Sequence, residues 1–173
     1  MIERRAGLQD NSTMILPARG GKLVTLILAV FLCSGLAAAK DIAVVVSKAS
    51  TVDSMALADL VKACKGQTNR WPDGKPVTVV TRDPGSPEMH LVLEKVYGVS
   101  KDEVAALITN ANHNRVNHPA IVVVDSDEAV VKKVETTPGA IGLVDVYAIT
   151  GAVQVLKIGG KLPLQPGYAL HGN

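Results

Sequence analysis

Aromatic residues are scarce in this sequence. It holds one tryptophan, three tyrosines and one phenylalanine among 173 residues, which is 3% of the chain. Surfaces that stack nucleic-acid bases and cages that hold quaternary ammonium groups are both built from aromatic rings. The composition therefore argues against both kinds of site.

Cysteine is also nearly absent, with only Cys33 and Cys64. Leu32 is bulky where a lipoprotein signal has a small residue, so we expect no lipid anchor on Cys33. If the leading segment is removed, Cys64 remains alone and no internal disulfide can form. Cys64 lies beside the apolar stripe of a helical pattern, and we expect it to be buried.

Charged residues are missing from one stretch near the start, Leu23 to Ala39. Arg19 and Lys22 precede this apolar run, and Ala37 and Ala39 occupy the two small-residue positions of an A-x-A cleavage site. A basic flank, an apolar run and a small-residue end are typical of a secretory signal peptide. The sequence therefore predicts cleavage after Ala39.

The signal peptide is assigned to residues 1–39, with Met14 as an alternative start because residues 1–13 are polar and fit no part of a signal. An uncleaved membrane anchor is the other reading, although the run is shorter than the ~20 residues that span a bilayer. Cleavage predicts a periplasmic or secreted protein.

Neither sign of charge dominates the rest of the chain. Residues 1–39 hold four basic and two acidic residues, so residues 40–173 number 134 and carry 14 basic and 14 acidic residues. The sequence pI of about 8.5 therefore overstates how basic the exported chain is. No nucleic-acid partner is expected.

Beyond residue 39, short β-branched runs alternate with amphipathic helical patterns. The pattern predicts strands at 42–46, 77–80, 120–124, 140–146 and 152–158, and helices at 55–65, 87–97, 101–111 and 126–135. A pairing of the last two strands across residues 147–151 is one arrangement that the sequence allows. The alternation predicts a single α/β domain over 40–173, with a mixed sheet flanked by helices.

Several helix ends carry specific signals. Gly66 and Gly98 follow two of the helical patterns and are expected to stop them. Ser100 with Glu103 forms an S-x-x-E capping box, and Ser126 precedes acidic residues at the start of the last helix.

Three stretches, taken in order, resemble phosphate-type (PstS-like) periplasmic solute-binding proteins. Ile42 to Arg82 is similar to a family segment that runs strand, polar loop, helix, Trp-containing turn and strand. "TRDPGSPE" stands in the place of the family's R-x-D-G-S-G-T phosphate loop, and "TPGAIGLVDV" is similar to its TPGAIGYV strand. The resemblance covers nearly all of Ile42 to Pro163.

This resemblance implies the fold of a type II periplasmic binding protein, in which two α/β lobes close on an oxyanion. The chain is too short for both lobes, and the matching segments look like the second one. The implied function is a substrate-binding-like module of an ABC transport family, with phosphate as the first ligand, a membrane permease or envelope protein as partner, and no cofactor. The alternative is an envelope interaction module that kept the fold and lost the ligand.

Carried over residue by residue, the phosphate loop matches Arg82, Gly85 and Ser86. In the family, arginine gives a bidentate contact, glycine lets the backbone approach and serine donates its hydroxyl. The resemblance implies that these residues bind the ligand, assisted by Ser50 and Thr51 from the loop after the first strand. Ser50 and Thr51 could instead cap the helix that follows, and the N-cap preference of Ser and Thr favours capping.

Three positions depart from the family loop. Pro84 stands where the family has an aspartate that accepts the proton of hydrogen phosphate. Pro87 replaces a glycine and removes one N–H donor, and Glu88 replaces threonine with a carboxylate that would repel an anion. The stretch is equally explained by plain capping, with Ser86 as N-cap, Pro87 at the first helical position and Glu88 in the first turn.

Other polar clusters have simpler explanations. His113 and His118 flank Arg115, but no third metal ligand lies near them, so we interpret this loop as a solvated turn. The carboxylates of residues 125–128 are explained by their place at a helix start. No G-x-S-x-G, H-E-x-x-H or P-loop motif occurs, and we interpret the chain as a binding protein without enzymatic activity or metal.

Overall fold

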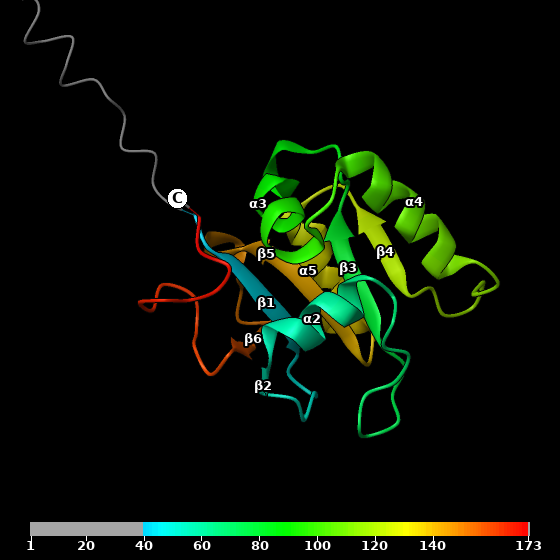
Figure 1. Ribbon diagram of the computed structural model, residues 1–173. Coiled ribbons are helices and arrows are strands. Elements are labelled where there is room, and N and C mark those ends of the chain that lie inside the picture. Colours follow the sequence, from blue (N-terminus) through cyan, green and yellow to red (C-terminus); the bar gives the residue numbers. More distant parts are fainter. Residues whose placement is uncertain (1–39, 173) are drawn as a thin grey trace, which may run out of the picture. The chain divides into compact units, whose positions relative to one another are not determined.

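A computed structural model describes residues 40–172 of this chain (Figure 1). The predicted signal peptide over residues 1–39, its cleavage site after Ala39, the alternative start at Met14, and Cys33 all lie outside the described residues. Within the described part, no helix is both long and apolar enough to cross a membrane.

Five strands form one mixed sheet in the order β4-β3-β5-β1-β6. Their bounds are Ile42–Ser47 (β1), Thr78–Arg82 (β3), Ile121–Val124 (β4), Ala140–Asp145 (β5) and Val153–Val155 (β6). Strand β3 runs parallel to β4 and β5, whereas β1 runs antiparallel to β5 and β6. The predicted mixed sheet is confirmed, but β5 and β6 are not paired with each other because β1 lies between them.

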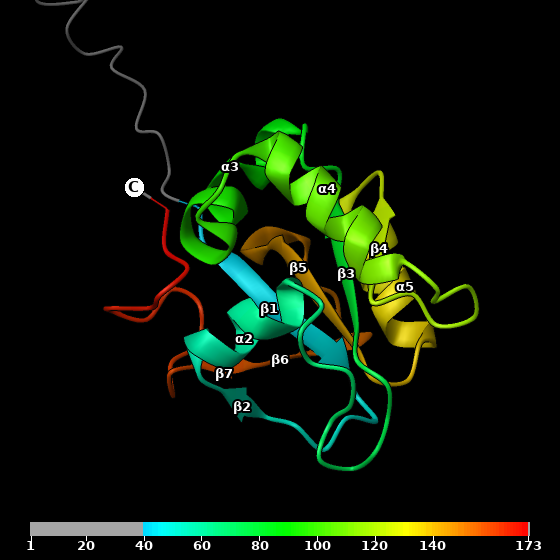
Figure 2. The same ribbon diagram turned by 45° about the vertical axis from the view of Figure 1, so that its right-hand side comes forward.

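Helices cover both faces of this sheet (Figure 2). On one face the core includes residues of α2, α3 and α4, and on the other face it is built around α5. The helical elements are Leu57–Cys64 (α2), Pro87–Met89 (η1), His90–Val92 (α3), Leu93–Tyr97 (η2), Lys101–Asn112 (α4), Asp127–Thr136 (α5) and Val146–Ala148 (η3). The layers are those of the predicted α/β domain.

Strand β1, which lies inside the sheet between β5 and β6, is buried on both faces. Val44 and Val46 belong to the core under α2 and α3, while Ala43 and Val45 belong to the core under α5. A strand covered on both sides is a continuous apolar run, not an alternating one, which is why "IAVVV" could be recognised in the sequence. Cys64 is fully buried as predicted, and burial raises the pKa of its thiol to about 12.

Helix α5 packs closely on β5 at Gly142. A Cβ added there would lie 2.7 Å from Cγ1 of Val130 and 2.8 Å from Cγ2 of Val134. Any larger residue would push α5 away from the sheet, so this glycine fixes the spacing between α5 and the strand ends that form the candidate site.

Two predicted helices differ from the structure. Ser54 and Met55 form the short strand β2 (Ser54–Met55), paired in parallel with β7 (Lys157–Ile158), so α2 begins only at Leu57. The helix expected at 87–97 consists of a 3₁₀ turn, a short α segment and a π segment in succession. Its end at Gly98, with φ of 66°, is as predicted.

The capping signals in the second half are confirmed. The Ser100 hydroxyl accepts from the Glu103 amide, and the Glu103 carboxylate accepts from the Ser100 amide, which completes the capping box of α4. The Ser126 hydroxyl accepts from the Ala129 amide and caps α5.

Both ends of the described chain are fastened together by hydrogen bonds. Lys40 O accepts from the Gly172 amide and Leu170 O accepts from the Ile42 amide. The side chain of Asp41 is fully buried, with Oδ1 2.5 Å from Nδ1 of His171 and Oδ2 accepting from the Leu164 amide. This buried carboxylate therefore ties the C-terminal segment to the start of β1.

Candidate functional site

Arg82 is the last residue of β3. It lies at the edge of the sheet that is formed by the carboxyl ends of the parallel strands β3, β4 and β5, not along an outer strand. It stands opposite Val124, the last residue of β4. In open α/β sheets, ligands bind outside the carboxyl ends of the strands. The Arg82 side chain is only 19% exposed, so its guanidinium lies at this edge in a largely desolvated position.

Two carboxylates face the Arg82 guanidinium. Oε2 of Glu88 lies 3.3 Å from Nη2, and Oδ1 of Asp127 lies 3.7 Å from Nη1. Both contacts are ion pairs and neither is a hydrogen bond; the second distance is also too long for one. The charge of Arg82 is therefore more than compensated from within the chain, while part of its hydrogen-bonding capacity is left over.

Asp127 is held more firmly than Glu88. It is the first residue of α5, its side chain is 12% exposed, and its Oδ2 accepts from the Asp145 amide at 3.3 Å. The pKa of Asp127 is raised mainly because burial penalises the carboxylate, and the Asp145 and Glu128 charges add to this; the Asp145 amide and Arg82 oppose it. Asp127 is thus held in place beside Arg82, although its burial disfavours the charged form of the carboxyl group.

Two polar atoms of this loop are buried without a hydrogen-bond partner, Nε of Arg82 and Oγ of Ser86. Among the described residues, the hydroxyl of Tyr97 is the third such side-chain atom. Buried polar groups in native proteins are nearly always paired with protein, water or a ligand. Two orphaned donors four residues apart in the predicted phosphate loop are therefore the strongest sign of a ligand position in the described chain.

The loop itself uses the backbone donors that the family resemblance implies for a ligand. Oδ1 of Asp83 accepts from the Gly85 amide at 2.6 Å, and the carbonyl of Asp83 accepts from the Ser86 amide. Asp83 thus closes the turn and takes the place of an anion at these two amides. Of the three predicted residues, Arg82 and Ser86 keep available side-chain donors, and Gly85 contributes only the turn.

The plain capping interpretation is also incomplete. Ser86 occupies the N-cap position and Pro87 follows it, but the Ser86 hydroxyl makes no capping hydrogen bond. The helical segment that begins here is a three-residue 3₁₀ turn. Ser86 therefore lies at the N-cap position, but its side chain does not make the hydrogen bond that would cap the segment.

Ser50 and Thr51 lie at the other edge of the sheet from Arg82. They follow the end of β1, and β1 is antiparallel to β5, so this end lies beside Ile141 near the start of β5. Strand β3 is parallel to β5 and ends at the opposite edge. The structure does not bring the two predicted groups together, and a phosphate-sized ligand cannot contact both.

Capping by Ser50 and Thr51 was wrong as well. The N-cap of α2 is Ala56, which has no side-chain hydrogen bond, and the Ser50 hydroxyl instead accepts from the amide of Val52 at 3.2 Å. Helix α2 begins at Leu57, two residues later than expected, and β2 lies between it and the Ser50 loop, so this loop is outside capping range.

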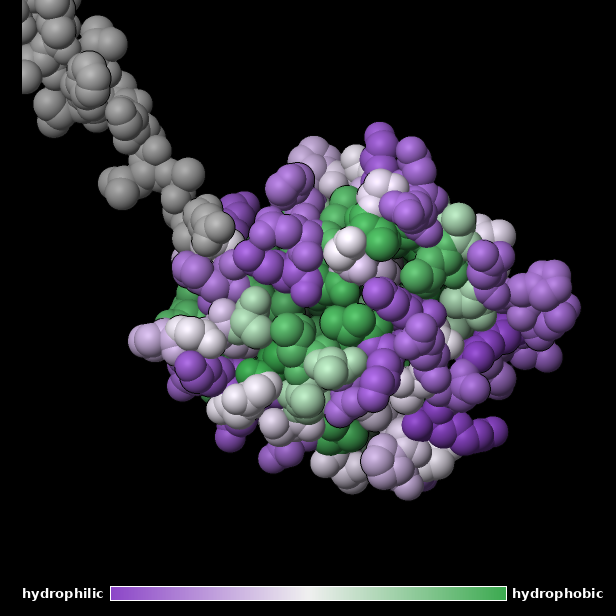
Figure 3. Space-filling model, in the orientation of Figure 1, coloured by the Kyte–Doolittle hydropathy of each residue, from purple (hydrophilic) through white to green (hydrophobic). Residues whose placement is uncertain are grey.

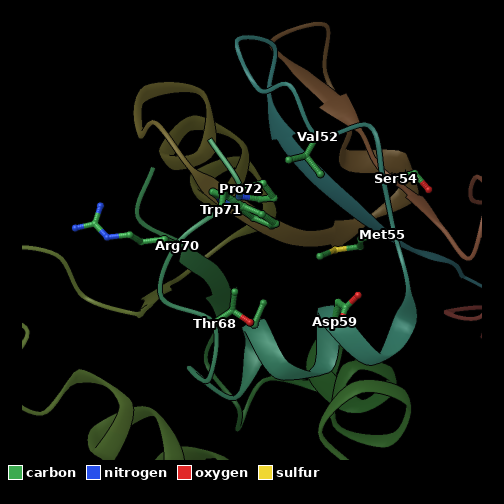
Figure 4. Close-up of a pocket in the computed structure, with 9 residues that line it drawn as sticks. Val52, Ser54, Met55, Asp59, Thr68, Arg70, Trp71 and Pro72 are labelled. Atoms are coloured by element: carbon green, nitrogen blue, oxygen red, sulfur yellow. The ribbon is translucent and has the colours of Figure 1, made fainter. Parts of the chain in front are cut away.

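A cavity of about 450 Å³ opens at this second edge, beside the Ser50 loop (Figure 4). Trp71 and Met55 lie on opposite sides of it, and the indole Nε1 of Trp71 donates to the carbonyl of Gly139 at 2.8 Å. Its lining is mainly apolar and consists of Val52, Ser54, Met55, Asp59, Ala63, Thr68, Arg70, Trp71 and Pro72. The helical face seen in Figure 3 also shows apolar residues at its centre within a polar surround.

The remaining polar clusters offer no second candidate. A guanidinium nitrogen of Arg115 donates to Oδ1 of Asn69, which places the loop of His113 and His118 against the turn after α2. The described residues contain no group of three or more His, Cys, Asp or Glu side chains suited to hold a metal.

Asp127 is the site residue that sequence reasoning missed. Its carboxylate was attributed to the helix start alone, yet it reaches Arg82 from another element. The signal is topological and appears only in the fold: β3 and β4 are adjacent parallel strands, so the last residue of β3 and the residues that follow β4 meet at one edge.

Comparison with known proteins identifies the fold. No protein-family model matches the sequence, and a search of the curated proteins finds no match. Among solved structures, an ABC-type phosphate transport receptor from Vibrio cholerae matches with a TM-score of 0.63 and 19% identity over 78% of this chain and 54% of that one. PstS from Borrelia burgdorferi matches with a TM-score of 0.59 and 15% identity over 78% of this chain and 55% of that one. A phosphate-binding protein from Stenotrophomonas maltophilia matches with a TM-score of 0.58 and 15% identity over 72% of this chain and 40% of that one.

These similarities show an α/β fold matching a single lobe of a periplasmic binding protein. The described sheet and its flanking helices span about half the length of the phosphate receptors that they match. The resemblance to PstS-type proteins that the sequence suggested is therefore confirmed at the level of the fold.

Proposed function

We propose that this chain is a substrate-binding-like module that holds a small oxyanion, with phosphate the first candidate, at Arg82. The observation that carries the proposal is the pair of buried donors without partners, Nε of Arg82 and Oγ of Ser86, at the ligand-binding edge of the sheet. The solved structures of the same fold are named as phosphate receptors, which agrees with an oxyanion.

The chemistry of the site fits a tetrahedral oxyanion. A guanidinium donates two parallel N–H groups to two oxygens of one anion, and a serine hydroxyl can donate to a third. Because Arg82 is largely buried, such contacts form in a medium where charge-assisted hydrogen bonds are strong. The described lobe would contact the anion from one side, so a second surface would be needed to enclose it.

The proposed setting is outside the cytoplasm. Cleavage of residues 1–39 would release the domain into the periplasm or the medium, where the ligand would be passed to an ABC permease or shared with an envelope protein. The balanced charge of residues 40–173 agrees with a small ligand and not with a nucleic acid.

Calorimetric titration of the purified, folded protein with inorganic phosphate and with sulfate tests the ligand proposal. Arg82→Gln should abolish the heat of binding, while Arg70→Gln, which changes an exposed arginine at the other edge of the sheet, should leave it unchanged. If neither anion gives heat or a chemical-shift change on folded protein, the ligand proposal fails.

The second candidate is an interaction module of the cell envelope. The mainly apolar cavity beside Trp71 and the apolar centre of the helical face favour it, because such surfaces are typical of protein contacts (Figures 3 and 4). Co-purification of a stable complex with one envelope protein would support this function, and tight phosphate binding by the isolated monomer would count against it.

A further inference from the structure

We propose that Glu88 is an internal occupant of the anion position at Arg82, and that it sets how tightly a tetrahedral oxyanion binds there. The inference rests on the proposed oxyanion function and assigns to Glu88 the role of a competing ligand. The geometry of the Arg82 guanidinium and the unequal anchoring of its two carboxylates carry it.

The guanidinium has one side that can accept an anion through two donors. Nε and Nη2 lie on the same side of the group, and their N–H bonds form the side-on fork that receives two oxygens of a carboxylate or phosphate. Glu88 lies at Nη2, at 3.3 Å, while Nε is buried and has no partner. The fork is therefore half occupied, and a bidentate anion must displace Glu88 to take both donors.

The two carboxylates around Arg82 are not equivalent. Asp127 contacts Nη1, on the other side of the guanidinium, and is 12% exposed and bonded to the Asp145 amide. Glu88 is 49% exposed and can rotate into solvent. An incoming anion would thus leave Asp127 in place as the group that orients Arg82 and would exchange with Glu88.

The formal charges around Arg82 also give Asp127 and Glu88 different roles. Arg82 with Asp127 is formally neutral, and Glu88 adds one negative charge at the point where an anion would rest. Glu88 therefore weakens the site twice, by occupying Nη2 and by repelling the ligand. Anions with two or more oxygens that can bridge Nε and Nη2 would compete best, whereas a monatomic anion such as chloride would not.

The chain offers a matched control for the test. Glu94 lies in the nearby π segment η2, is 50% exposed, and pairs with Lys95 at 2.8 Å instead of with Arg82. Glu88→Gln and Glu94→Gln remove the same charge from side chains of equal exposure. Glu88→Thr is a second variant that removes the carboxylate altogether.

The experiment is a titration of inorganic phosphate into each folded protein, followed by calorimetry and by amide chemical shifts, with circular dichroism as the check of folding. We expect Glu88→Gln and Glu88→Thr to lower the dissociation constant for phosphate by roughly fivefold, the upper end of the factor that corresponds to losing a partly exposed ion pair. Glu94→Gln should leave it within a factor of about two, and Arg82→Gln combined with Glu88→Gln should bind no phosphate.

The outcomes separate the two proposals. Phosphate binding that is equal in the wild type and in both Glu88 variants would overturn the role of Glu88 and leave the oxyanion function standing. Absence of binding in all of them would overturn both. Binding that appears only when Glu88 is replaced would support the role of Glu88 as the occupant of the site and would overturn the ligand function proposed for the wild-type chain.

Discussion

The guanidinium of Arg82, at the end of β3, lies 3.7 Å from the carboxylate of Asp127, at the start of α5. Both side chains are mostly buried, at 19% and 12% exposed, and they join the sheet to the one helix that covers its second face. The pair therefore has a structural role that can be measured without any ligand.

We expect Arg82→Met to lower the free energy of unfolding by about 1–3 kcal/mol, because it leaves the Asp127 carboxylate buried without a compensating charge. Asp127→Asn in the same chain should recover part of this loss. Urea unfolding of the two single variants and the double variant gives the coupling energy. A coupling near zero would contradict the pairing. Lys62→Met, which removes an exposed pair with Asp59, should cost less than about 1 kcal/mol.

The raised pKa of Asp127 predicts a specific pH dependence of stability. The folded chain binds this proton more tightly than the unfolded chain, so the stabilisation is full below the ordinary carboxyl pKa of about 4 and is lost as the pH rises through the higher folded value. The Asp127→Asn variant has no carboxyl group at this position, so it does not lose this stabilisation as the pH rises. Its free energy of unfolding relative to wild type should therefore rise as the pH increases above about 4, measured by urea unfolding at a series of pH values.

Glu128, in the same turn of α5, should change stability with pH in the opposite direction to Asp127. Its pKa is lowered by hydrogen bonds to its own backbone amide and to the Ser126 side chain, so its stabilisation is present above the ordinary carboxyl pKa and lost in acid. Glu128→Gln should therefore lose stability relative to wild type as the pH rises through that range. Equal slopes for the two variants would contradict both assignments.

Ser100 and Ser86 occupy the same position relative to a helix start but should respond differently to replacement by alanine. Ser100→Ala breaks a formed capping box and should cost about 1 kcal/mol in the free energy of unfolding. Ser86→Ala removes a buried hydroxyl without a partner and should be neutral or slightly stabilising in the absence of ligand. Thermal unfolding of both variants decides this, and a loss at Ser86 as large as at Ser100 would restore its role as a cap.

The contact between His171 and the buried carboxylate of Asp41 should hold the C-terminal segment in place. His171→Ala leaves Oδ1 of Asp41 without its partner and should cost about 1.5–3 kcal/mol, the range for hydrogen bonds to charged groups. Hydrogen exchange should become faster at the Ile42 amide, which donates to Leu170 O. His118→Ala, at an exposed position, is the control, and unchanged protection at Ile42 would refute the role of His171.

The sequence correctly predicted those elements whose structure is determined by residues close to one another in the chain. The buried β-branched run of β1, the capping box at Ser100 and the glycine stop at Gly98 were all read from the sequence, because each depends on side chains within a few residues. The start of α2 was misplaced because Met55 pairs with Ile158, a partner far along the chain that no local pattern reveals.

The candidate site divides in the same way. Arg82 and Ser86 could be identified from a loop motif, and the conflict between Glu88 and an anion was visible in its charge. The contribution of Asp127 depends on which strands are adjacent, and the separation of Ser50 from Arg82 depends on β1 being antiparallel to β5. Both facts belong to the pairing of the sheet, which the sequence pattern leaves undetermined.

The position of β1 has a consequence for how the chain reaches its fold. This first described strand lies inside the sheet, and its two neighbours, β5 and β6, follow only after every other strand of the sheet and all of the helices named α. Until Ala140 to Val155 are available, the apolar strand Ile42–Ser47 has no partner on either side. Because closing such long loops slows folding, a growing chain would remain unfolded until most of it has been synthesised.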